Sequence, residues 1–415
     1  MFRAACVALV SVGALSGCAT DYVQRMGKVR ALYEAGDGDG AVALLDKSFK
    51  NTPDEKGINK LLLLLDRGMM LHAAGKWKES LATLHQADEL SQKLDFTSVT
   101  EEAGVLLTNE GTRTYRGEDF EKLMISMLLA LNYSALGQTE DALVEVRRIN
   151  ERITKMVVEE KKPYEQLAIT RYLGAVLWES QNELDSAAID YLEAAKTMKG
   201  ALGSLAPEFL RILKKTARDD AYRDYKKKFP DVRDDALSKD AAQVVVVIEA
   251  GRAPKKESTQ KEFAGGVGAP TLIAIPFYPP RLRALPNAKV SVGSESVTAA
   301  VVTSMDEVAQ THLNDRVGKL VAKQIASLAI KGALAAGVGA ATNNKALGML
   351  AFGLLAMTQQ ADTRSWLTLP AEFQVARLRV PPGATKVSVD YGGRVTTHPV
   401  DVKPGRIALV LVRRF

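Results

Sequence analysis

The residues that could carry chemistry are concentrated in one polar stretch, from Tyr115 to Arg148. Glu118 and Glu121 are three residues apart, as are Glu145 and Arg148, so each pair shares one face of a helix. An arginine beside carboxylates can dock an acidic tail or a chain terminus. The same side chains could instead form a capping and salt-bridge set at a helix junction. The candidate protein-binding residues are Tyr115, Arg116, Glu118, Glu121, Asn132, Glu145 and Arg148.

Catalytic and metal-binding patterns are not evident in the sequence. It has neither a zinc-type His/Cys spacing nor a nucleophile elbow. We therefore expect no catalytic residue, no metal and no cofactor, and we interpret the chain as a non-enzymatic binding protein. An enzyme or glycan-binding factor acting on peptidoglycan is an alternative, and it would require convergent carboxylates in a polar pocket. The four histidines are scattered over the chain: His72, His85, His312 and His398.

The N-terminal residues have the pattern of a lipoprotein export signal. Arg3 precedes a short apolar run, which ends in Leu-Ser-Gly directly before Cys18. This pattern resembles the bacterial lipobox, which implies that residues 1–17 are removed and that Cys18 carries the lipid anchor. The next residue is Ala19 and not an aspartate, and this pattern is similar to that of lipoproteins that are passed on to the outer membrane. We expect a protein held in the outer membrane by the Cys18 lipid and facing the periplasm.

Cysteine content and charge exclude several classes of protein. Cys6 leaves with the signal and Cys18 is lipidated, so we expect no disulfide or cysteine metal ligand in the mature chain. The net charge of +6 is mild for 415 residues. Basic residues alternate with acidic ones, as in 214–228, which is typical of a solvated helix face. Nucleic acid is therefore not an expected partner.

The polar stretch lies within a region of helical periodicity, which runs from Tyr22 to about Met198 with short Gly, Asn and Asp breaks. A single helical hairpin cannot bury its own apolar face, so neighbouring hairpins stack. We predict an all-α tetratricopeptide-like solenoid over residues 18–230, with a plain α-bundle as the alternative. The repeat pattern is clearest in the windows 64–87, 130–149 and 175–194, and it is weaker in 32–53.

Several short motifs occur together in this chain. They are YRGEDFE (115–121), ALNY (130–133), VEVRR (144–148), EAGRAPK (249–255) and ADTRSW (361–366). Their combination behind a lipobox resembles a family of tetratricopeptide-like bacterial lipoproteins of uncharacterised function, over most of the mature chain. The resemblance gives the motifs no chemistry. Because such proteins are often encoded near activators of penicillin-binding proteins, it implies work in the cell envelope or on peptidoglycan.

The second half, residues 231–415, has a different pattern. Short β-branched or alternating segments are separated by Pro/Gly turns such as 381–383 and 403–405, which favours an antiparallel β-sandwich. The chain as a whole is thus predicted to be an α+β multidomain protein. The expected strands are 244–249, 271–278, 289–292, 296–304, 373–380, 386–391, 394–402 and 407–412.

An apolar segment rich in small residues interrupts these strands, at about 315–360. Its two arms are each too short to span a bilayer, and a polar turn at 342–345 separates them. We predict an inserted helical hairpin, because its glycines allow the two arms to approach closely. One interpretation is that the hairpin is buried against the rest of the protein. The other is that it enters the bilayer or packs against the same hairpin of other subunits.

Taken together, these patterns predict a non-catalytic adaptor or scaffold whose helical repeats bind an envelope protein or peptide, with a link to peptidoglycan synthesis. The alternative is an oligomeric, membrane-associated assembly built through the apolar hairpin 317–357, which would make the protein a homo-oligomer.

Overall fold

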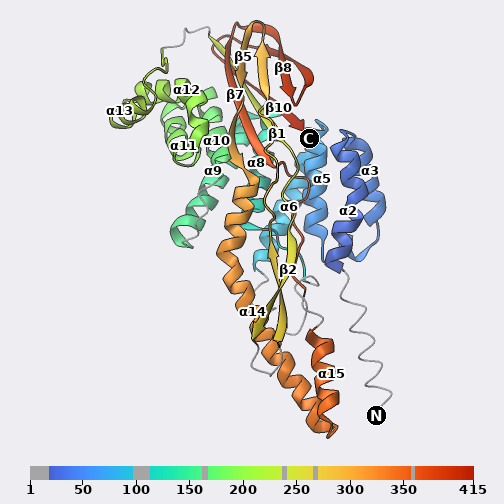
Figure 1. Cartoon of the computed structure of the whole chain (residues 1–415). Helices are drawn as coiled ribbons and strands as arrows, with labels where there is room; N and C mark the ends of the chain where they lie inside the picture. The colour runs from blue at the N-terminus through green and yellow to red at the C-terminus, as the bar shows by residue number, and fades with distance from the viewer. Residues whose placement is uncertain (1–17, 97–112, 161–166, 236–240, 265–269, 357–359) are drawn as a thin grey trace.

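The computed structural model describes residues 18–96, 113–160, 167–235, 241–264, 270–356 and 360–415. The predicted export signal, residues 1–17, lies outside the described residues. Cys18 is the first residue of α2 (Cys18–Glu34). The described first half is helical and the second half carries several sheets, so the chain is α+β, as predicted (Figure 1).

Antiparallel helix pairs make up the first half. The turns within the first four pairs contain Gly36, Gly75, Gly137 and Asn182, all with positive φ. Gly68 allows the second pair to pack closely, since a Cβ there would lie 2.5 Å from a Leu84 methyl carbon. The pairs are α2 with α3 (Gly38–Phe49), α5 (Lys60–Ala73) with α6 (Trp77–Phe96), α8 (Asp119–Ala135) with α9 (Thr139–Thr154), α10 (Ala168–Ser180) with α11 (Leu184–Thr197), and α12 (Leu202–Lys215) with α13 (Asp219–Lys228).

Shorter helices connect these pairs. The single turn α4 (Pro53–Lys56) precedes α5. A π-helical turn, η2 (Lys155–Glu159), continues α9. A 3₁₀ turn, η3 (Lys199–Ala201), leads from α11 into α12. Helix α13 has no buried residue, as expected for a solvated face.

The second half contains two four-stranded sheets. One has the order β10-β1-β7-β6 and the other β5-β4-β8-β9. β1 pairs with β7 in antiparallel fashion but with β10 in parallel, so the prediction of a purely antiparallel arrangement is wrong. The strands of the first sheet are β1 (Ala242–Ala250), β6 (Ala300–Ser304), β7 (Glu372–Val380) and β10 (Ile407–Arg414); those of the second are β4 (Lys289–Val292), β5 (Glu295–Thr298), β8 (Gly383–Tyr391) and β9 (Arg394–Val402).

The first sheet is the middle of three layers. Every residue of β1 is buried. Val245 and Val247 belong to the same apolar core as the helices. Val244 and Val246 face the other way, into a core shared with the second sheet. Alternate residues of one strand therefore join the helical half and the second sheet into a single body.

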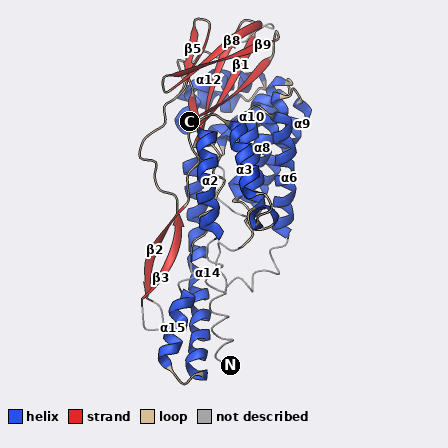
Figure 2. Cartoon of the chain, turned by 90° about the vertical axis from the view of Figure 1, so that its right-hand side faces the viewer, coloured by secondary structure: helices blue, strands red, loops and turns tan. Residues whose placement is uncertain are grey.

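An arm projects from one end of this body (Figures 1 and 2). Helix α14 (Met305–Ala341) runs out beyond the body and α15 (Lys345–Ala356) folds back along it. We call α15 and the part of α14 from Gln324 onward the arm. The predicted hairpin is thus longer than expected, because α14 begins at Met305, where the Ser304 hydroxyl caps it by accepting from the Glu307 N–H. A hairpin of β2 (Glu257–Ala264) and β3 (Pro270–Phe277) lies beside α14.

Candidate functional site

The predicted polar residues lie where the helical half meets the second half. Segment 115–121, which enters α8, meets residues 362–368 of the second half. The N–H of Trp366 donates to Glu121 Oε1 at 2.7 Å. The Arg364 guanidinium lies 5.4 Å from the centre of the Tyr115 ring. Two of the motifs noted in the sequence, YRGEDFE and ADTRSW, therefore contact each other in the folded chain.

Glu118 is at the centre of a buried ion-pair group. Its carboxylate accepts from Lys256 Nζ at 2.6 Å and also pairs with Arg316 of α14. Lys256 Nζ also donates to the carbonyl of Arg364 at 3.1 Å. Burial alone would raise the pKa of Glu118, but the charges of Lys256 and Arg316 outweigh burial and hold the pKa at about 2. Glu118 thus ties α8 to α14 and to the segment before β2.

Glu121, one turn further along α8, is only 1% exposed. Its carboxyl accepts from the Tyr115 hydroxyl at 2.6 Å, from the Glu118 N–H at 2.9 Å and from Trp366. Burial, together with the nearby charge of Glu118, raises the pKa of Glu121 to about 7. A carboxyl with three internal donors and almost no exposure holds structure and is not open to a substrate.

A second buried carboxyl holds the same segment. Asp66 of α5 accepts from the Thr368 N–H at 3.1 Å, from the Thr368 hydroxyl at 2.8 Å and from the Tyr22 hydroxyl at 2.6 Å. Arg364 donates to Asn59 Oδ1 at 2.9 Å. Residues 364–368 therefore lie against the helices, whose carboxylates Glu121 and Asp66 accept from the backbone N–H groups of Trp366 and Thr368.

Asn132 takes part in another contact between the two halves. The Ser80 hydroxyl donates to the Gly68 carbonyl at 2.7 Å, so the Asn132 amide nitrogen donates to Ser80 and its oxygen faces His72 Nδ1 at 2.6 Å. His72 Nε2 lies 2.8 Å from a carboxylate oxygen of Glu249 on β1. Both imidazole nitrogens face acceptors, an arrangement that favours the doubly protonated ring. Burial lowers the pKa of His72, but the charge of Glu249 and the hydrogen bonds to Glu249 and Asn132 together outweigh it and raise the pKa.

Glu145 and Arg148 belong to a separate group on α9. Arg148 is 45% exposed and donates to the buried Glu145 at 3.1 Å. Asp88 of α6 lies 3.7 Å from Arg148 and pairs with Arg152 at 2.7 Å. Within the described residues, Glu145 and Arg148 make no hydrogen bond or ion pair with Glu118 or Glu121. Tyr115, Glu118 and Glu121 thus lie together, whereas Asn132 and the Glu145–Arg148 pair belong to two other contact groups.

Arg116 lines a cationic pocket of about 340 Å³ at the base of the arm. Among the described residues, seven basic and three acidic side chains line the pocket. Its basic residues are Arg113, Arg116, Lys122, Lys256, Arg316, Lys323 and Arg364, and its acidic residues are Asp95, Glu118 and Asp362.

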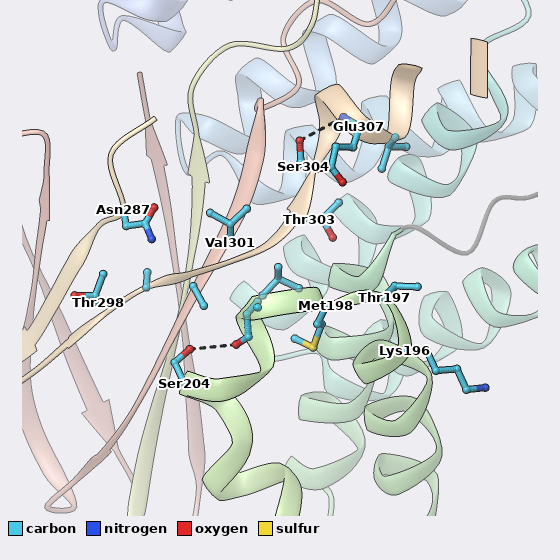
Figure 3. Close-up of a pocket in the computed structure, with 16 residues that line it drawn as sticks. Lys196, Thr197, Met198, Ser204, Asn287, Thr298, Val301, Thr303, Ser304 and Glu307 are labelled. Carbon is cyan, nitrogen blue, oxygen red and sulfur yellow. Dashed lines mark hydrogen bonds between the residues drawn. The ribbon is translucent and has the colours of Figure 1, made fainter. Parts of the chain in front are cut away.

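A larger groove, of about 670 Å³, is lined in part by Glu307 and Val308 at the start of α14 (Figure 3). We call it the β6 groove, since the consecutive residues 298–304 form one wall, and β6 is the last strand of its sheet. Met198, Ala201 and Ser204, around the turn from α11 into α12, form the facing wall (Figure 3). Within the described ranges, β6 has no second strand partner.

Sequence reasoning missed Lys256, Arg316 and Arg364, although each is essential to the contacts of Glu118 or of residues 362–368. Arg364 lies inside the ADTRSW motif and Lys256 directly follows EAGRAPK, so the motifs themselves were the available signal. Across the described part of the chain, no group of three or more His, Cys, Asp or Glu side chains is arranged to hold a metal ion.

Comparisons with known proteins give no family. No family model matches the chain, and no curated protein matches it.

Proposed function

We propose that this protein is a lipid-anchored, non-catalytic adaptor of the bacterial envelope, which binds an extended segment of a partner protein in the β6 groove. In this proposal the helix pairs are a tetratricopeptide-like solenoid, the two sheets are a β-sandwich, and the Cys18 lipid holds the chain at the outer membrane on its periplasmic side. The observation that carries the proposal is the edge strand β6, whose residues line the groove along their whole length.

An edge strand selects its ligand by backbone chemistry. Its outward N–H and C=O groups can pair with one more strand, so an extended peptide adds to the sheet, and nearby pockets take alternate side chains. Ala300 and Val301, both half-buried, supply apolar surface at this groove, and Ser204 lies exposed on the facing helix. The volume is within the range of ligand clefts.

The inner side of the helix array is less suited to a partner. It already packs against β1 and residues 364–368, through buried groups such as Glu121, Asp66 and His72. A partner entering there would have to displace a segment of this chain. The β6 groove requires no such displacement, and this supports the groove as the docking surface.

The position of the groove also suits an adaptor. Ser304 and Val308 line it at the start of α14, and the arm is at the other end of the same helix. At 1.5 Å per residue, about 50 Å separate the groove from the tip of α14. Helix α2 begins at Cys18, at the end of the body from which the arm projects (Figures 1 and 2). With that end at the membrane, the groove faces the periplasm.

Photo-cross-linking in cells tests the proposal. A photoreactive residue at Ser204 should cross-link to one short segment of an envelope protein, and a synthetic peptide of that segment should bind the purified protein. The variant Ser204→Trp fills the groove from an exposed position and should abolish peptide binding. Lys215→Trp, also exposed on α12 but outside the groove, is the matched control. Equal binding by both variants would exclude the groove.

A second function is favoured by the arm: a membrane-associated, oligomeric assembly. α14 is long and apolar enough to cross a membrane, and only 28% of its most apolar window is buried. Large apolar side chains are exposed on the arm: Leu334, Val338, Leu347, Met349 and Leu350. We expect replacement of residues 324–356 by a short turn to abolish vesicle insertion and oligomers while the body stays folded. Unchanged membrane extraction and mass would reject this function.

A further inference from the structure

We propose that a pocket at the end of β10 binds a carboxylate group of a peptide, at a site separate from the β6 groove. The pocket has a volume of about 280 Å³ and lies between the turn after α2, the start of β9 and the end of β10. Figure 1 shows this end of the chain, marked C, between the helices and the sheets. β10 and β6 are the two outer strands of the first sheet, so the pocket and the groove are at opposite edges.

The pocket brings three cations together. They are Arg394, Arg413 and Arg414. Among the described residues, Glu34 is the only acidic side chain in the lining. Both of its oxygens are already engaged, because Arg30 lies 3.2 Å from one and Arg252 lies 2.9 Å from the other. The lining therefore offers the three arginines no carboxylate of its own, and an anion from outside can take that place.

The hydrogen-bond acceptors of Arg413 and Arg414 are all neutral groups, within the described residues. Arg413 donates to a tyrosine hydroxyl at 2.9 Å and otherwise to main-chain carbonyls. Arg414 donates to a threonine hydroxyl and to a main-chain carbonyl. The charge of Arg413 also acts on the carboxylate of Glu249, but that carboxylate is bonded to His72. These bonds hold the guanidinium groups in place without neutralising them.

Arg414 in particular is a half-buried cation without a counter-ion. Burial lowers the pKa of its guanidinium. Its Nε atom is buried and has no hydrogen-bond partner in the described part of the chain. Burial and the charge of Arg414 together also lower the pKa of His398 on β9. A cation withdrawn from water without an anion is destabilised, so an anion in the pocket would stabilise Arg414.

The walls of the pocket favour a carboxylate that is part of a peptide. The rings of Tyr33 and Phe415 line the pocket and meet edge to face, 4.9 Å apart, so they offer apolar surface to the carbon atoms next to a carboxylate. Carbonyl and hydroxyl oxygens already take several donors of Arg413 and Arg414. The few that remain suit the two oxygens of a carboxylate better than the oxygens of a phosphate. A volume of about 280 Å³ is small for a ligand cleft and suits one residue of a peptide.

The pKa of His398 gives a direct test, measured by nuclear magnetic resonance on the full chain with labelled histidines. Thr396 Oγ1 contacts His398 Nε2 at 3.1 Å and also accepts from Arg414, so an anion beside Arg414 should raise the pKa of His398. Three peptides are the probes: acetyl-trialanine has a terminal carboxylate, acetyl-alanyl-aspartyl-alanine amide has a side-chain carboxylate, and acetyl-trialanine amide has neither. We expect a saturable rise with a carboxylate peptide and none with the third. The tighter of the two carboxylate peptides identifies the source of the group.

Matched variants locate the binding. Arg394 and Lys403 are both exposed, at the two ends of β9, but only Arg394 lines the pocket. Arg394→Gln should weaken peptide binding about three- to fivefold, as for an exposed ion pair, and Lys403→Gln should leave it unchanged. Arg414→Gln should weaken it by about tenfold or more, and should raise the pKa of His398 without any peptide. Ser204→Trp, which fills the β6 groove, should bind the peptide like wild type, so the two sites are tested separately.

Several results would overturn the proposal. No change in the pKa of His398 with either carboxylate peptide would reject the site. An equal rise with acetyl-trialanine amide would show that the carboxylate is not recognised. Inorganic phosphate acting at a lower concentration than both carboxylate peptides would overturn the choice of ligand. Equal weakening by Arg394→Gln and Lys403→Gln would reduce the effect to the overall charge of the protein.

Discussion

Glu118 and Glu121 lie one helical turn apart, yet their surroundings shift their carboxyl pKa values in opposite directions. Glu118 faces two cations, and its pKa is about 2. Glu121 faces neutral donors and the charge of Glu118, and its pKa is about 7. The ordinary value for both is 4.5. This difference gives each residue its own pH window, in which the stability of the contact between the two halves changes.

The pH dependence of the free energy of unfolding follows from the directions of these pKa shifts. Between pH 4.5 and 7 the folded chain holds a proton on Glu121 that the unfolded chain has released, so the free energy of unfolding falls as pH rises. Asp66, with its pKa raised to about 6 by burial, acts in the same direction. The free energy of unfolding, measured with urea across this pH range, should show the fall. In Glu121→Gln the free energy of unfolding should depend less steeply on pH. An equal slope in the variant would contradict the assignment.

Removal of the Glu118 charge should be costly, because it leaves Lys256 and Arg316 without their carboxylate. We expect Glu118→Gln to lower the free energy of unfolding by about 3 kcal/mol. Since the pKa of Glu118 is lowered, wild-type stability should also fall as pH drops from 4.5 to 2. The fall should be smaller in the variant, in which Glu208 and Glu249, whose pKa values are also lowered, still contribute. Asp119→Asn is the control. Glu118→Gln/Lys256→Met should recover part of the loss, and no recovery would argue against the pairing.

At the scale of elements, the arm depends on the close approach of two glycines. A Cβ on Gly348 would lie 3.0 Å from the Ala335 carbonyl oxygen and 3.2 Å from Gly339 Cα. Gly353, on the same helix, has no atom within 4 Å of the corresponding position, among those described. The backbone contact between α14 and α15 thus requires a glycine at position 348 but not at position 353.

Gly348→Leu should therefore separate the two helices of the arm, and Gly353→Leu should not. Spin labels at Ala333 and Ala351 report the separation by electron paramagnetic resonance. The midpoint of thermal unfolding of the body should stay near that of wild type in both variants, because the arm is outside the main core. Equal label distances in the two variants would contradict the packing of α15 on α14.

Local patterns in the sequence predicted most of the elements. Glycine turns such as Gly75 and Gly137 mark the helix pairs, and alternation with Pro/Gly turns marks most strands. β2 was missed because its sequence, ESTQKEFA, is polar and pairs only with β3 on the outside of the body. The parallel pairing of β1 with β10 was also missed. No short turn connects these strands, so their direction depends on the packing of the whole chain.

At the scale of the whole molecule, the two halves share one core. Residues of β1 and β7 pack in the same apolar cluster as the helices, and so does Trp366. Long-range bonds join the halves: His72 to Glu249, Asp66 to Thr368 and Glu179 to Arg377. Sequence patterns placed each residue in an element, but they could not pair residues so far apart in the chain, because such pairs depend on the complete fold.

This shared core predicts cooperative unfolding. Differential scanning calorimetry of the protein should give one transition, and a fragment ending at residue 230 should not fold independently. Trp366→Ala should lower the free energy of unfolding by about 3 to 5 kcal/mol, since it leaves a cavity in that core. Two separate transitions, with a stable helical fragment, would show that the halves are independent.

Exchange of the β6 amides in the presence of the partner segment tests the adaptor function most directly. The partner peptide identified by cross-linking at Ser204 is added to the protein, and exchange is followed residue by residue. We expect slower exchange of the amides in 300–304, as an added strand pairs with β6, and little change along β9, an edge strand of the second sheet. Slowing confined to the helices, with β6 unchanged, would contradict docking at the β6 groove.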